Sequence, residues 1–146
     1  MALGKGAAYS TSVLDLLLNA TPIANIADDT ATDPLTSLYV SLHTASPEAG
    51  NQTTSECAYT GYARVAVSRN AGTPKWSVAA GAAENAEAID FAECTALSST
   101  ATHFAVGSLT AGAGVVYYCG QLTAPLAISA GITPSFAAGA LDITED

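Results

Sequence analysis

Short runs of alternating apolar and polar residues recur along the chain, and glycine or proline stands between most of them. In Ser37–His43 the apolar residues Leu38, Val40 and Leu42 occupy every second position. Alternation of this kind is the period of a strand with one buried face, whereas a helix needs a period near 3.6 residues. The pattern therefore predicts a mainly all-β fold.

About eight strands are expected, and Tyr59–Ser68 is predicted to be the central one, with Ala63, Val65 and Val67 on its buried side. Strands joined by Gly/Pro turns at regular spacing favour one β-sandwich or jelly-roll domain over a βαβ fold. The expected strands are 37–43, 59–68, 76–78, 88–91, 103–109, 115–122, 126–129 and 141–144, with a hairpin between the fifth and sixth.

The amino-terminal residues differ from this pattern. Met1–Ala8 is rich in glycine and alanine, so it is predicted to be a flexible arm ahead of a single domain over 9–146. Ser12–Asn19 is predicted to form one short helix, capped by Ser10 or Ser12. The long polar connection Thr44–Glu56 is expected to be mobile or to make contacts, because loops of this length usually do one or the other.

The charge balance narrows the class of partner. Four basic residues face thirteen acidic ones, and no Lys or Arg follows Lys75. A phosphate-binding groove needs clustered cations, so nucleic acid and anionic membrane surfaces are disfavoured. Charged residues make up only 12% of the chain, so the surface consists largely of small polar side chains, which suits extensive contact with other protein.

Metal and thiol chemistry are not indicated. Cys57, Cys94 and Cys119 are odd in number and lack a CxxC spacing, so they are predicted to be buried free thiols made in a reducing compartment. Asp28, Asp29 and Asp33 could gather a calcium ion, but they match no EF-hand loop. We therefore expect turn carboxylates there, and no cofactor.

Catalytic arrangements are equally weak. His43 and His103 could form a hydrolase triad with Asp90 and a serine, but the chain has no Gly-x-Ser-x-Gly elbow. Gly112–Gly114 lacks the lysine and the helix of a phosphate loop, which favours a hairpin turn. Cys57 has no basic neighbour in sequence to activate it. The sequence predicts no enzyme active site.

Two features on the predicted strands need partners. Arg64 is a cation in a chain with few, and it is expected to form a partly buried bridge with Asp90 or Asp142, or else to project into a subunit contact. In the adjacent pair Tyr117–Tyr118, one ring is expected to face the core and the other to face outward.

Several runs together resemble a family of small bacteriophage virion proteins, often labelled tail-fibre-like and in some phages found as capsid cement or decoration proteins. The resemblance covers about residues 35–146. It is carried by Leu38–Pro47, Gly61–Val67, Thr102–Phe104, Val106–Gly107 and Gly131–Ile143.

This resemblance implies a non-enzymatic structural protein of the virion, made in the host cytoplasm. Its main implication is a cement protein on the capsid exterior, bound to the major capsid protein between capsomers as a dimer or trimer. A tail or fibre component involved in host attachment is the alternative. No catalytic residues carry over, because the shared motifs are structural. Met1–Ala8 and Thr44–Glu56 are expected to supply the contacts.

Overall fold

The computed structural model describes residues 3–19, 22–23, 26, 35–69, 72–79 and 82–144. These residues form a mainly β fold with one short helix, as the sequence predicted. The elements are β1 (Leu3–Lys5), α1 (Ala7–Asn19), β2 (Ser37–His43), β3 (Val65–Ser68), β4 (Trp76–Ala79), β5 (Ala82–Asn85), β6 (Ile89–Asp90), β7 (Ser99–Gly107), β8 (Val116–Ile128), β9 (Ser135–Phe136) and β10 (Asp142–Thr144).

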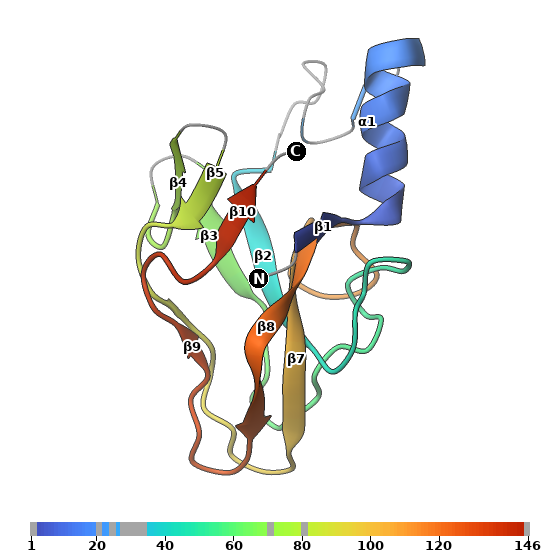
Figure 1. The fold of residues 1–146 in the computed structure, drawn as a ribbon. Helices are drawn as coiled ribbons and strands as arrows, with labels where there is room; N and C mark the ends of the chain where they lie inside the picture. The colour runs from blue at the N-terminus through green and yellow to red at the C-terminus, as the bar shows by residue number, and fades with distance from the viewer. Residues whose placement is uncertain are drawn as a thin grey trace.

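The strands form three antiparallel sheets (Figure 1). The largest has the order β1-β8-β7-β2-β3, a second has the order β10-β5-β4, and β6 pairs with β9. The main core draws buried side chains from all three sheets, among them Leu42 and Phe104 from the large sheet, Ile89 from β6 and Ile143 from β10. The arrangement is that of a single β-sandwich.

The centre of the large sheet is β7, and the prediction that Tyr59–Ser68 is the central strand is wrong. Only Val65–Ser68 pairs as a strand, and it lies at the sheet edge beside β2. Gly61 has a φ of 101°, and the Tyr62 amide donates to the Tyr59 carbonyl at 3.0 Å. This turn breaks the extended run, because alternation in sequence does not reveal a backbone reversal.

Strand β8 continues through Pro125, where the sequence predicted a connection between two strands. Ala101 pairs with Leu126 and His103 with Gln121, so Thr102 alone faces residues 122–125 across a wide bulge. Proline donates no hydrogen bond, and a bulge is a place where the ladder needs none.

The amino-terminal segment is paired rather than free. Leu3–Lys5 forms β1 against β8, where the sequence predicted an arm without regular structure, and the Gly6 amide donates to the Tyr117 carbonyl at 3.0 Å. This pairing uses main-chain groups, so the Gly/Ala composition gave no side-chain signal of it. Met1 and Ala2 lie outside the described residues.

Helix α1 begins at Ala7, not at Ser12 as predicted. The Ser10 amide donates to the Gly6 carbonyl at 2.9 Å, and the Ser12 hydroxyl bonds the Ala8 carbonyl at 3.0 Å. Both serines are therefore inside the helix, and neither caps it. The pairing of β1 with β8 fixes the chain just before the helix, and so sets where the helix begins. A capping pattern read from neighbouring residues carries no information about this pairing.

Strand β5 was not predicted. Its sequence, Ala82–Asn85, contains no β-branched or aromatic residue, so strand propensity is low. Its place is set by two neighbours, since β4 and β10 both pair with it.

The two glycines of the amino-terminal segment test how tightly it is held. A Cβ added at Gly6 would lie 2.0 Å from the Val116 carbonyl oxygen, whereas one at Gly4 would lie no nearer than 3.5 Å, from the Glu48 carboxylate. Gly6→Ala should lower the free energy of unfolding by about 1–3 kcal/mol, or detach β1, through overpacking. Gly4→Ala should change it little.

Urea unfolding measures the first effect, and hydrogen exchange at the amides of Leu3–Lys5 detects the second. Equal behaviour of the two variants would contradict the observed docking of the segment.

Candidate functional site

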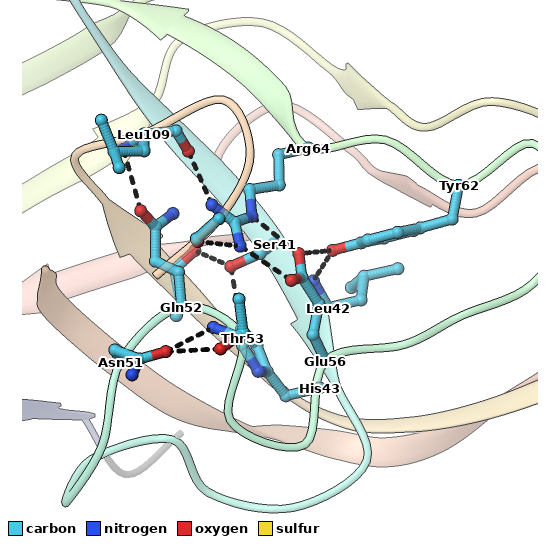
Figure 2. Close-up of polar contacts among 12 residues, drawn as sticks. Ser41, Leu42, His43, Asn51, Gln52, Thr53, Glu56, Tyr62, Arg64 and Leu109 are labelled. Atoms are coloured by element: carbon cyan, nitrogen blue, oxygen red, sulfur yellow. Dashed lines mark hydrogen bonds and ion pairs between the residues drawn. The ribbon is translucent and has the colours of Figure 1, made fainter. Parts of the chain in front are cut away.

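A cluster of polar side chains lies where the 44–56 loop, the start of β3 and the β7–β8 loop meet (Figure 2). We call it the polar cluster. It consists of Ser41, His43, Gln52, Glu56, Tyr62 and Arg64, four of which are among the buried polar residues of the chain.

Arg64 holds the cluster together. Its Nε and Nη2 donate to the two carboxylate oxygens of Glu56, each at 2.7 Å. Its Nη1 donates to the Leu109 carbonyl at 2.9 Å, and Nη2 also donates to the Gly112 carbonyl at 2.8 Å. The Arg64 side chain is 2% exposed and that of Glu56 is 16% exposed. A bidentate pair with further carbonyl acceptors is the geometry in which a buried guanidinium is well compensated.

Neither predicted partner contacts Arg64. Asp90 accepts a hydrogen bond from the Ser135 hydroxyl, and Asp142 lies opposite Glu84 in the sheet. The prediction of a buried bridge is confirmed, but its acceptor is Glu56. The sequence offered this answer only weakly, because Glu56 sits at the end of a polar loop and its position depends on how that loop folds back.

Tyr62 extends the pair to the backbone of β2. Its hydroxyl donates to the Glu56 carboxylate at 3.0 Å and accepts from the Leu42 amide at 3.0 Å. Burial raises the pKa of Tyr62, so the phenol stays protonated and can donate. The 44–56 loop is thus tied to β2 as well as to the β7–β8 loop.

Gln52 fixes the β7–β8 loop from its other side. It is fully buried, and its side-chain Oε1 accepts from the Leu109 amide at 2.9 Å. The backbone N–H of Gln52 donates to the Gly114 carbonyl at 2.9 Å. A Cβ at Gly107 would lie 2.2 Å from Gln52 Cδ, and one at Gly114 would lie 2.0 Å from Oε1. The Gln52 side chain fits only because residues 107 and 114 are both glycine. Sequence reasoning missed Gln52.

His43 is bonded to Ser41, which gives the outline of a serine–histidine pair. Its Nε2 lies 2.8 Å from the Ser41 hydroxyl, and its Nδ1 lies 2.9 Å from the Thr54 carbonyl. A carbonyl only accepts, so Nδ1 carries the proton and neutral Nε2 accepts from Ser41. Burial lowers the pKa of His43, and both residues are fully buried. A substrate could not reach this hydroxyl.

The triad considered from sequence is not assembled. His43 and His103 pair across β2 and β7, but His103 is only half-buried and its Nδ1 lies 2.8 Å from the Thr102 hydroxyl. Asp90 is bonded to Ser135 on β9 instead. His103 lines a hollow of about 350 Å³, together with Gly4, Ser46, Glu48, Cys119, Gly120 and Gln121. Within the described ranges, no group of three or more His, Cys, Asp or Glu could hold a metal ion.

The comparison with protein families decides what class of protein this is. The family model described as podophage GP4 fiber I protein gp80 matches residues 9–144. The chain belongs to this family. It is a family of phage virion proteins, which agrees with the resemblance noted from the sequence. No curated protein matches the chain.

The remaining predicted features can be placed within this family member. Cys57, Cys94 and Cys119 are buried and unpaired, as predicted. Burial raises the pKa of Cys57 and that of Cys119 to about 11, so both thiols stay protonated at neutral pH. Gly112–Gly114 lies in the β7–β8 loop, as predicted for a hairpin turn.

The prediction of one outward ring in the pair Tyr117–Tyr118 is wrong. Tyr117 is buried, and Tyr118 packs partly buried against the main core. The Tyr9 ring of α1 lies 5.1 Å from the first and 5.6 Å from the second, in edge-to-face contacts. The helix covers the surface that the sequence left open.

Asp28, Asp29 and Asp33, considered for calcium, lie outside the described residues. Within the part of the chain that the structure describes, no helix is both long and apolar enough to cross a bilayer.

Arg64→Met should lower the free energy of unfolding by about 3–5 kcal/mol, because it leaves the largely buried Glu56 carboxylate without its cation. Arg64→Lys should recover only part of this loss, since an ammonium cannot make the bidentate contact. Arg69→Met is the matched control, as Arg69 is exposed. Urea unfolding monitored by Trp76 fluorescence gives the values. A loss below about 1 kcal/mol in Arg64→Met would contradict the role assigned to the pair.

His43 predicts a pH dependence of stability. Burial lowers the folded-state pKa of His43 below its ordinary value of 6.5, so below pH 6.5 the unfolded state binds more protons than the folded state. The contribution of His43 to stability is therefore complete above this pH and declines from there toward the folded pKa. His43→Gln should remove this part of the pH dependence, whereas His103→Gln should retain it. Chemical denaturation of both variants between about pH 7.5 and about pH 5, a range that brackets the ordinary histidine pKa, tests this prediction.

Proposed function

We propose that this protein is a non-enzymatic structural component of a phage fibre or tail. The match of residues 9–144 to a fibre protein family carries the proposal. The geometry supports it, because each charged or nucleophilic group of the polar cluster is engaged in holding loops together. The Ser41–His43 pair is buried, and the Arg64 guanidinium donates its hydrogen bonds to Glu56 and to two backbone carbonyls.

Its partners would be other virion proteins and further copies of this chain. The rigid framework leaves exposed positions on the 44–56 loop, including Thr44–Ser46 and Glu48–Gly50. The Glu48 carbonyl accepts from the Ala7 amide at 3.0 Å, and the Thr44 amide donates to the Ser55 carbonyl at 2.7 Å. A loop held at both ends loses little conformational entropy on binding, so it suits a permanent contact in an assembly.

The capsid cement interpretation ranks second. Its support is the weakly charged, acidic surface, which suits an external position away from DNA but is equally compatible with a fibre. The family description names a fibre protein, and this favours the tail assembly as the location.

Immunogold electron microscopy of purified phage tests the proposal, using antibody raised against the folded chain. Label confined to the fibres or tail is the expected result, with a copy number per particle far below that of the major capsid protein by gel densitometry. Label spread over the head at hundreds of copies would refute the fibre assignment and favour cement.

A hydrolytic activity would be the other way for the proposal to fail. His103 is the histidine that lines a hollow, so activity against a panel of ester and glycoside substrates that disappears in His103→Gln would contradict the non-enzymatic role.

A further inference from the structure

The outer face of the β10-β5-β4 sheet is exposed at most of its described positions. Trp76 and Ala83 point to the opposite face and pack against the core, as does Ile143 of β10. Side chains alternate along a strand, so their neighbours point outward. The described outward residues are Ser77, Ala79, Ala82, Glu84, Asp142 and Thr144, and all except the half-buried Ala82 are exposed. In Figure 1 the sheet stands at one side of the sandwich, away from α1.

This face carries a shallow hollow of about 210 Å³. It is lined by Ser77, Ala79, Ala82, Ala83, Glu84 and Asp142. Ala79 and Ala82 present methyl groups to this hollow, and the two carboxylates supply the charge. A lysine or arginine side chain has an apolar stem and a cationic head. The stem would lie against the alanine methyl groups, and the head would lie against the two carboxylates.

The two carboxylates are placed unfavourably for the isolated chain. Glu84 and Asp142 are directly opposite each other in the antiparallel register of β5 and β10. Like charges in this relation repel, and they destabilise a sheet unless a cation lies between them. Neither carboxylate has a hydrogen-bond or ion-pair partner within residues 3–144 as far as these are described, and Arg64 is already committed to Glu56.

We propose that this face docks a lysine or arginine side chain presented by another virion protein. The proposal rests on the assembly role proposed above and names the surface and the chemistry of one partner. Charge complementarity favours a cationic partner, because the chain carries a net charge of −9 and no Lys or Arg follows Lys75. A bare divalent cation fits less well, since it prefers six or more oxygen ligands and the hollow offers two carboxylates.

The test is an NMR titration of the folded, isotopically labelled chain with an acetylated and amidated tri-lysine peptide at low salt. Chemical-shift changes are expected at the amides of Ser77, Glu84 and Asp142. The double variant Glu84→Gln/Asp142→Asn should weaken binding at least tenfold. It should also raise Tm, because it removes the repulsion, and this shows that the variant is folded.

The matched control is Glu87→Gln/Glu93→Gln, which removes the same charge from exposed or half-buried positions outside the hollow. Full retention of binding in this control is expected. Equal weakening in both double variants would show attraction to net charge alone and overturn the proposal. Saturation of the same amides by calcium chloride at a lower concentration than the peptide would also overturn it, in favour of a metal site.

This titration uses the protein away from the particle, so it is independent of where the protein sits in the virion. Head labelling by immunogold would refute the fibre assignment and leave the docking surface standing, whereas loss of specific peptide binding would refute only the surface.

Discussion

The buried contact between Arg64 and Glu56 is the constraint on which one end of this sandwich depends. Removing two charges from water costs several kcal/mol per ion, and the cost is recovered only when every donor finds an acceptor. Here the guanidinium meets a bidentate carboxylate and the carbonyls of Leu109 and Gly112. The 44–56 loop, β3 and the β7–β8 loop are therefore fixed as one unit, and none can move without breaking a buried charge pair.

Around this pair, chemistry that could have been catalytic is used for structure. The hydroxyl of Ser41 bonds His43, the phenol of Tyr62 bridges Glu56 to the β2 backbone, and the Gln52 amide occupies a space left by two glycines. Each of these residues is buried at least in part, and each makes a side-chain hydrogen bond inside the chain. Rigid loops on a stable sheet are what a protein needs when its task is to be held in place by neighbours, and this links the fold to the proposed role in the phage fibre.

On the outer face of the β10-β5-β4 sheet, in contrast, charged groups lack partners among the described residues. Glu84 and Asp142 are exposed and face each other without a cation from the described chain. The proposed docking of a cationic side chain would relieve the repulsion between these two carboxylates. The polar cluster is thus directed inward, whereas the carboxylates of Glu84 and Asp142 are exposed on the surface.

The sequence by itself determined the fold class and the strands whose side chains alternate. Ser37–His43 and the hairpin over β7 and β8 follow directly from the local period. The free cysteines follow from their odd number and the lack of a CxxC spacing. Backbone pairing was not readable, so β1, β5 and the continuation of β8 through Pro125 were missed or divided.

Only the tertiary structure decided the partner of Arg64, the sheet order that puts β7 at the centre, and the juxtaposition of Glu84 with Asp142. The physical reason is common to all three. Periodicity reports which face of a strand is buried, but contacts between segments distant in sequence depend on turns such as that at Gly61 and on loops that fold back, and their energies arise only after the chain has closed.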